Sequence, residues 1–196
     1  MPLGEAPVPY DQAYFDNYAK YEGTPMGEAI TKTRCEMLER HDDEIEQSFV
    51  MDVGIGSGAF LKALRKRGWK NAYGIDVNPI AINWLKACNH YWYDGPYKPE
   101  AIDVMSFWDV LEHIPDPNPL FEKYQPKVVL VSMPIYQTEA EALASKHFKP
   151  GEHCWYFSVG GLIRFMQQRK YRTVEINTAE TQLGRKSVYS FAFKRM

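Results

Sequence analysis

Two short stretches of this sequence place acidic residues and glycines at spacings that suit a nucleoside ligand. In the first, Asp52 is followed by Gly54, Gly56 and Gly58, and in the second, Asp76 closes a short apolar run. Glycines let the backbone come close to a ligand, and a carboxylate at the end of the next strand can accept hydrogen bonds from both ribose hydroxyls. The spacing therefore predicts a nucleoside cofactor, with Asp76 as its ribose ligand.

The glycine spacing alone fits two classes of cofactor. Gly54, Gly56 and Ala59 satisfy the loose G-x-G-x-x-G/A pattern of dinucleotide-binding proteins. Asp52, however, stands two positions before the first glycine, where a carboxylate would repel a pyrophosphate but would suit the cationic methionine end of S-adenosylmethionine. We therefore expect S-adenosylmethionine, with S-adenosylhomocysteine as its product, and keep a nicotinamide dinucleotide as the alternative.

The segment D-V-L-E-H-I-P-D-P at 109–117 adds a second, ordered pattern. The D-x-G-x-G-x-G run resembles that of class I S-adenosylmethionine-dependent methyltransferases. Segment 109–117 resembles the D-V-L-E-H-I/V-x-D-P signature of their ubiquinone-biosynthesis-like branch (methyltransferase type 11/12). Segments 130–134 and 149–158 resemble later parts of the same family, so the resemblance extends from Val50 to the C-terminus. It implies an α/β, Rossmann-like class I methyltransferase fold, with a mostly parallel seven-stranded sheet, helices on both faces and an antiparallel last strand.

The resemblance also implies further cofactor contacts. Val77 would pack on the adenine, Asp94 would accept from its amino group, and the ring of Trp108 would face the sulfonium. Arg34, on an N-terminal helix, would pair with the methionine carboxylate. Each of these residues has a structural alternative: core packing for Val77 and Trp108, an ordinary turn for Asp94, and a surface position for Arg34.

Methyl transfer is an in-line substitution in which the enzyme mainly aligns the acceptor and excludes water. A hydroxyl acceptor would also be helped by a base near the ends of the fourth and fifth strands. His113 is the candidate catalytic residue, because the resemblance puts it at the mouth of the site. The alternative is a helix-start histidine bonded to backbone. His153 and Tyr136 are further candidates for acceptor contacts.

A metal site is a separate interpretation of the same segment. Asp109, Glu112 and His113 form D-x-x-E-H, and His147 or His153 could complete a ligand set. Ubiquinone-biosynthesis and small-RNA 2′-O-methyltransferases similarly use carboxylates and histidines around such a motif to hold a divalent ion, which can polarise a hydroxyl. The first acid there is commonly glutamate, and Asp109 has a shorter reach. We therefore assign no metal ligand and keep the divalent ion as an alternative.

Composition limits the class of protein. The chain has 196 residues, of which 45% are hydrophobic and 24% charged, which suits one compact domain. A net charge of -2 gives no general attraction to nucleic acid, and three widely spaced cysteines argue against a disulfide scaffold. No segment approaches the roughly 20 apolar residues of a membrane span, and the first ten lack a signal peptide's apolar core. We expect a cytoplasmic protein; its oligomeric state is not predicted.

The elements that must position these residues follow from apolar periodicity and helix breakers. We expect a single methyltransferase domain, 1–196, in which 1–48 forms a helical cover and 49–196 the Rossmann-like core. The predicted helices are 26–41, 59–67, 79–88 and 159–168. The predicted strands are 48–53, 71–75, 89–93, 103–107, 128–133, 172–176 and 187–193. The aromatic residues expected to cover the site are Tyr10, Tyr14, Phe15, Tyr18 and Tyr21.

Taken together, the sequence predicts methyl transfer from S-adenosylmethionine to the oxygen of a small-molecule or sugar-like acceptor. Two alternatives stay open: a non-catalytic module that binds S-adenosylmethionine or S-adenosylhomocysteine, and a nicotinamide-dependent oxidoreductase. No large insertion separates the fifth and sixth strands, so only 135–154 and the N-terminal segment are available to close the site.

Overall fold

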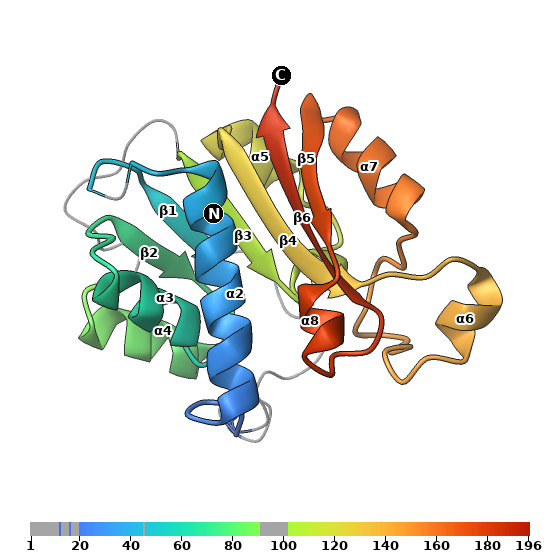
Figure 1. Ribbon diagram of the computed structural model, residues 1–196, viewed down its shortest axis with the longest axis horizontal. Coiled ribbons are helices and arrows are strands. Elements are labelled where there is room, and N and C mark those ends of the chain that lie inside the picture. Colours follow the sequence, from blue (N-terminus) through green and yellow to red (C-terminus); the bar gives the residue numbers. More distant parts are fainter. Residues whose placement is uncertain (1–11, 13–15, 17–19, 45, 91–101) are drawn as a thin grey trace.

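A twisted, mostly parallel sheet forms the centre of the molecule (Figure 1). The computed structural model describes residues 12, 16, 20–44, 46–90 and 102–196. Within them the sheet has six strands in the order β2-β1-β3-β4-β6-β5. The strands are β1 (Val50–Val53), β2 (Ala72–Ile75), β3 (Val104–Trp108), β4 (Val128–Pro134), β5 (Tyr171–Asn177) and β6 (Val188–Arg195).

Strand direction follows the predicted topology. β1 pairs in parallel with both β2 and β3, and β3 pairs in parallel with β4. β6 is antiparallel to its two neighbours, β4 and β5. Parallel neighbours need crossover connections, which helices supply on both faces. The predicted α/β class and the antiparallel last strand are confirmed.

Several helices begin after a residue whose side chain caps them. Asn78 Oδ1 accepts from Ile80 N at 2.9 Å ahead of the helix that opens with Pro79, as the Asn-Pro pair predicts. Thr24 Oγ1 caps the long N-terminal helix by accepting from Gly27 N at 3.1 Å. The helices are α2 (Pro25–His41), α3 (Ala59–Lys66), α4 (Pro79–Ala87), the 3₁₀ turn η2 (Leu111–His113), α5 (Asn118–Tyr124), α6 (Glu139–Leu143), α7 (Val159–Gln167) and α8 (Ala179–Gln182).

The prediction of seven strands is corrected to six within the described residues. The strand expected at 89–93 lies mostly outside the described residues, which stop at His90 and resume at Ile102. Asn89 has a left-handed φ of 55°, which ends the turn after α4 rather than opening a strand. The carbonyl of His90 accepts from Gly74 N at 2.9 Å, so the backbone at His90 does run beside β2. The residues predicted as functional that lie outside the described part are Asp94, Tyr10, Tyr14, Phe15 and Tyr18.

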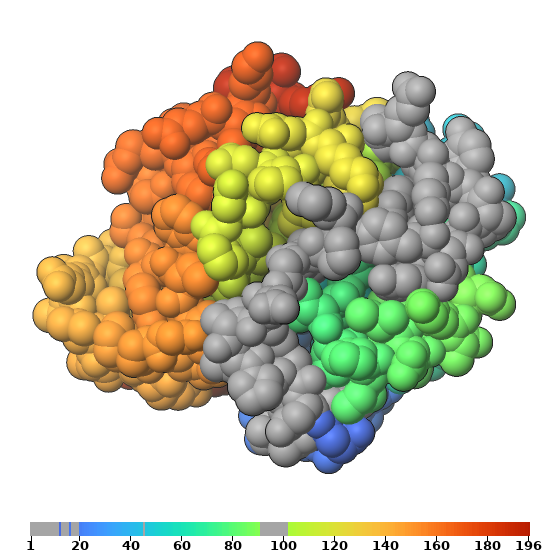
Figure 2. All heavy atoms as spheres, turned by 180° about the vertical axis from the view of Figure 1, so that it is seen from behind, coloured from blue at the N-terminus to red at the C-terminus, as the bar shows by residue number. Residues whose placement is uncertain are grey.

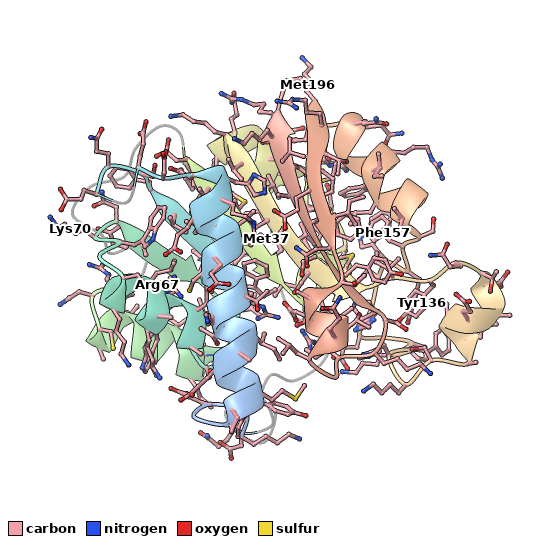
Figure 3. The ribbon with its side chains drawn as sticks, in the orientation of Figure 1. Met37, Arg67, Lys70, Tyr136, Phe157 and Met196 are labelled. Atoms are coloured by element: carbon pink, nitrogen blue, oxygen red, sulfur yellow. The ribbon has the colours of Figure 1, made fainter. Side chains whose placement is uncertain are left out.

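Two hydrophobic cores fill the space between the sheet and its helices. Alternate residues of β1 belong to different cores, because successive side chains of a strand point to opposite faces. Val50 packs with residues of α2, α3 and α4, including Met37, which is labelled on α2 in Figure 3. Met51 and Val53 pack with residues of α5 and α7, whose yellow and orange atoms lie on the face seen in Figure 2. The sheet is thus covered on both sides, and its strand ends are left for a site.

None of the helices within the described ranges combines the length and the apolar character that crossing a membrane requires.

Candidate functional site

A cavity of about 810 Å³ lies at the carboxyl ends of the central parallel strands. Ligands of open α/β sheets bind in this position. The first part of α2 and the loop before β6 also contribute to its walls. Of the residues predicted from the sequence, those that line it are Tyr21, Arg34, Asp52, Gly54, Gly56, Asp76, Val77, Trp108, Asp109, His113 and His147. Gly58 stands behind this wall as the residue that begins α3.

The three glycines of the turn after β1 all have a left-handed backbone, with φ of 72°, 55° and 75° at Gly54, Gly56 and Gly58. A Cβ at Gly54 would lie 2.5 Å from the side chain of Val110, and one at Gly58 would lie 2.6 Å from Trp84. A Cβ at Gly56 would meet nothing within 4 Å. Gly54 and Gly58 are therefore needed for packing, whereas Gly56 leaves its backbone open toward the cavity.

The carboxylate of Asp76 is held by backbone amides at the end of β2. Asp76 Oδ1 accepts from Asn78 N at 2.8 Å. Burial raises the pKa of Asp76, while backbone hydrogen bonds, among them those at Val77, Ile55 and Gly56, oppose that rise. The side chain is thus fixed between the two loops that the sequence singled out, in a position to accept hydrogen bonds from a ligand.

Asp52 is an acid inside the sheet, only 1% exposed. Its Oδ1 accepts from Ser106 Oγ on β3 at 2.7 Å. Burial raises its pKa to about 7, against the opposing effects of the Ser106 hydrogen bond and the charge of Arg34. A cation bound in the cavity beside Asp52 would favour its ionised form.

Arg34 is part of a group of four charged residues, which we call the charge cluster: Arg34, Asp109, Glu180 and Arg185. Arg34 Nε and Nη2 donate to the two carboxylate oxygens of Glu180, at 2.8 and 3.0 Å. Its side chain is only 15% exposed, so it is not the surface arginine that the sequence left open as an alternative. The sequence did not predict Glu180 or Arg185, because no motif surrounds them.

Asp109 is bound by both arginines of the charge cluster. Arg185 Nη2 lies 2.8 Å from Asp109 Oδ1, and Arg34 Nη2 lies 3.3 Å from Oδ2. Burial raises the pKa of Asp109, but the charges of Arg185 and Arg34 outweigh burial and hold that pKa below its usual value. The backbone of Asp109 is left-handed, with φ of 60°.

Trp108 precedes this turn, and the guanidinium of Arg34 lies 4.9 Å from the centre of its ring. The edge of Phe60 packs against Trp108 at 5.2 Å between ring centroids. The side chain is 7% exposed. Trp108 therefore belongs both to the core and to the cavity wall.

A second group, which we call the histidine cluster, consists of Glu112, His113 and His153. One potential ligand atom from each lies within 4.8 Å of the others. The two imidazole rings meet edge to face, 4.5 Å apart. The chain after His153 is fixed to η2, because the backbone N–H groups of Cys154 and Trp155 donate to the carbonyl of Glu112 at 2.8 and 3.2 Å. This contact brings segments 111–113 and 153–155 together.

The histidine cluster contains polar atoms with unused hydrogen-bonding capacity. Glu112 Oε2 and His113 Nδ1 are buried and make no hydrogen bond within the part of the chain that the structure describes. Burial lowers the pKa of His113 and raises that of Glu112 well above its usual value. One carboxylate and two imidazoles are donors that a borderline divalent ion accepts, so this set fits such an ion.

The structure separates residues that the metal interpretation had grouped. His153 joins Glu112 and His113, whereas Asp109 is bound in the charge cluster. His147 lines the cavity but is not a member of the histidine cluster. Tyr136, labelled in Figure 3, packs 6.1 Å from the ring of Tyr156 and is not among the residues that line the cavity.

Comparison with known proteins gives one family and several distant relatives. The model of the family described as "Methyltransferase domain" matches residues 26–176. The ubiquinone biosynthesis O-methyltransferase of Idiomarina loihiensis is 27% identical over 127 residues, which cover 56% of this chain and 52% of that protein. EEF1A lysine methyltransferase 2 of Mus musculus is 34% identical over 68 residues, or 35% of this chain and 28% of that protein. This chain spans between 18% and 52% of the lengths of the curated relatives that it matches.

A solved structure supports the fold over nearly the whole chain. The magnesium protoporphyrin IX methyltransferase of Synechocystis PCC 6803, with bound SAH, has a TM-score of 0.65 and 14% identity, and the match covers 95% of this chain and 96% of that one. A cyclase has a TM-score of 0.62 at 10% identity, covering 86% of this chain and 82% of its own. Since the same fold occurs in an enzyme named for other chemistry, the activity has to be argued from the site.

Proposed function

The chain belongs to the methyltransferase domain family, and on that premise we propose that it transfers the methyl group of S-adenosylmethionine to the oxygen of a small-molecule or sugar-like acceptor. One observation carries the proposal: the open backbone of Gly56 and the fixed carboxylate of Asp76 meet in one cavity at the strand ends. The family resemblance of the D-x-G-x-G-x-G run supports this choice of cofactor.

In the proposed complex, Asp76 accepts from the ribose hydroxyls and the glycine turn approaches the sugar and the methionine carboxylate. Val77, which lines the cavity beside Asp76, packs on the adenine, and Asp94 stays a prediction for the adenine amino group. Asp52 and the charge cluster lie toward the methionine end. The buried Asp52 favours this arrangement, because the cationic methionine group offsets the cost of its ionisation.

The acceptor enters on the side of η2, and His113 takes its proton. The hydroxyl oxygen forms a bond to the methyl carbon, the carbon–sulfur bond breaks, and its electron pair stays on sulfur, leaving S-adenosylhomocysteine. The lowered pKa of His113 favours a neutral imidazole at pH 7, which is the form that can accept the departing proton. Burial of the cluster excludes water from this exchange.

A divalent ion is a second candidate component of this end of the cavity. Glu112, His113 and His153 would hold it, and the orphaned Oε2 and Nδ1 atoms favour this assignment. When bound, the ion would supply positive charge that polarises an acceptor hydroxyl and lowers its pKa.

We also propose that the chain works as one domain in which residues 1–48 cover the cofactor. Several residues of α2, among them Met26 and Ile30, line the cavity and support this role. The net charge of -2 favours a small-molecule acceptor over a nucleic acid.

The first test is titration calorimetry of the protein with S-adenosylmethionine and S-adenosylhomocysteine, with NAD and NADP as controls. We expect micromolar binding of the two sulfur compounds and none of the dinucleotides. A screen of hydroxylated acceptors that follows release of S-adenosylhomocysteine, with and without Mn²⁺, then tests turnover and the need for an ion. Binding without turnover on any acceptor class would favour a non-catalytic module, and binding of a nicotinamide dinucleotide would favour the oxidoreductase.

A further inference from the structure

Helix α2 carries two arginines that each bind a glutamate from the C-terminal part of the chain. Arg40 Nη2 lies 2.7 Å from Glu175 Oε1 of β5, with the arginine side chain 48% exposed. Arg34 binds Glu180 of α8, whose side chain is 0% exposed. Figure 1 shows α8 next to α2. Only Arg34 lines the cavity, so the helix presents one ion pair to the site and a comparable one away from it.

The charge cluster contains equal numbers of positive and negative groups, which bind one another. Glu180 accepts two hydrogen bonds from Arg34 and a further one from Arg185. Arg185 then reaches Asp109, which Arg34 also contacts. Two guanidinium groups thus meet two carboxylates, and each buried charge is compensated by the others. Removing either carboxylate would leave both arginines with a single anionic partner.

One edge of the cluster is left for a ligand. Arg34 uses Nε and Nη2 for its bonds to Glu180, Asp109 and Ser132, while Nη1 makes no hydrogen bond among the residues described. A guanidinium has five donor hydrogens in a fixed fork, so anchoring one side aims the other. Since Arg34 lines the cavity, its remaining donors are available there.

The cluster lies at the methionine end of the proposed cofactor site. Asp76, the proposed ribose ligand, follows β2, whereas Asp109 follows β3, on the other side of β1. Arg34 and Asp52 of β1 line the same cavity, and the charge of Arg34 opposes the rise that burial causes in the pKa of Asp52. A cofactor with its ribose at Asp76 therefore extends its amino-acid group toward Arg34 and Asp109.

Building on the proposed function, we propose that Glu180 and Arg185 are positioning residues for the methionine end of the cofactor. They hold the guanidinium of Arg34 and the carboxylate of Asp109 at the cavity wall. These two groups carry one positive and one negative charge, which complement the carboxylate and the ammonium of the methionine group. Asp109 has a left-handed backbone that non-glycine residues seldom adopt, and its carboxylate contacts both arginines. Glu180 is fully buried and acts through the two arginines, whereas Arg185 also lines the cavity.

The test uses two ligands that differ only at the amino-acid end. S-adenosylhomocysteine carries the α-carboxylate and α-ammonium, and 5′-methylthioadenosine lacks both but keeps the adenosine and the thioether. Each is titrated into the wild type, Glu180→Gln and Arg185→Lys, with Glu175→Gln as the matched control on the second ion pair of α2. Melting temperatures are measured on the same samples.

We expect Glu180→Gln and Arg185→Lys to weaken S-adenosylhomocysteine binding about ten- to a hundredfold, the effect of losing one charge-assisted hydrogen bond. Binding of 5′-methylthioadenosine should change by less than about twofold, since the affected contacts are absent from that ligand. The control Glu175→Gln should lower the melting temperature and leave both affinities unchanged. Arg185→Lys, at a side chain that is 21% exposed, gives the same test if Glu180→Gln does not fold.

Three results would overturn the inference while the wild type binds S-adenosylhomocysteine: an equal loss for both ligands, no loss for either, or tighter binding after Glu180→Gln. The first would mean that the cluster only supports the fold. If the wild type binds neither ligand, the proposed function fails, and the inference fails with it for that separate reason.

Discussion

The two ends of the cavity are built in different ways. At the nucleoside end, Asp52, the glycine turn and Asp76 all come from one continuous strand–helix–strand segment. At the acceptor end, η2 meets the chain around His153. The charge cluster, at the methionine group of the proposed cofactor between the two ends, joins α2 to the end of β3 and to α8. The first end is a local structure and the second is assembled from segments far apart in the sequence.

This difference indicates which part of the cavity can change its specificity for the acceptor. A local motif keeps its geometry as long as its strand and helix form. The geometry of the nucleoside end therefore depends mainly on the segment 50–76. An end assembled from loops can change its acceptor by substitutions in segments such as 135–158 without disturbing the cofactor. We therefore expect the two ends to respond separately to mutation. Three predictions test this, and a fourth concerns the ion pair of α2 that lies away from both ends.

Asp76→Ala should have the largest effect, a loss of at least about a hundredfold in affinity for S-adenosylhomocysteine. In the proposed complex, the substitution removes the carboxylate that accepts from two ribose hydroxyls, and we expect this to cost about 3 kcal/mol or more. Titration calorimetry measures it. Because the ribose is shared, 5′-methylthioadenosine should lose as much. An unchanged affinity would mean that the ribose lies elsewhere.

His113→Gln tests the opposite end. We expect kcat to fall about a hundredfold, the usual contribution of a general base, while the affinity for S-adenosylhomocysteine stays within about twofold. Turnover is measured with the acceptor found in the screen. A parallel loss of cofactor affinity would break the comparison, since it would show that the two ends are coupled.

Gly54→Ala and Gly56→Ala distinguish packing from ligand approach within the nucleoside end. At Gly54 the new methyl meets Val110 at 2.5 Å, and we expect about 2–3 kcal/mol of destabilisation. At Gly56 the new methyl meets open space, so only the backbone cost of about 1 kcal/mol applies, yet cofactor affinity should fall. Chemical denaturation and calorimetry separate the two quantities. Equal destabilisation at both positions would contradict the assignment.

Glu175→Gln should have the smallest effect, under about 1 kcal/mol, because its partners are partly exposed. Despite burial, hydrogen bonds from Arg40, Asn177 and His41 lower the pKa of Glu175 to about 2. A lowered pKa stabilises the fold above the unfolded value of 4.5 and loses that effect as the pH falls toward 2. Thermal melts of wild type and mutant should therefore differ at pH 7 and converge near pH 2–3. Divergence on acidification would contradict the assignment.

The sequence predicted most accurately those features whose pattern lies within a few consecutive residues. The strands that bear Asp52 and Asp76 were predicted within one or two residues, because an apolar run followed by glycine or by Asn-Pro marks both strand and cap. The short helices α5, α6 and α8 were not predicted, since segments of four to seven residues show too little periodicity. The sequence identified His113 as a candidate, but it left two histidines, His147 and His153, as possible partners of His113 in a ligand set.

By itself, the sequence determined the α/β class, the family and the nucleoside end, because strand, turn, helix and acid follow one another within a single unit whose geometry is local. Only the tertiary structure decided that His153 rather than His147 meets His113, and that Arg34 is bound by Glu180. Both contacts depend on which loops and helices pack together across the sheet. Contacts such as the hydrogen bond from Trp155 N to Glu112 O join segments far apart in the sequence, and the spacing of residues along the chain does not reveal them.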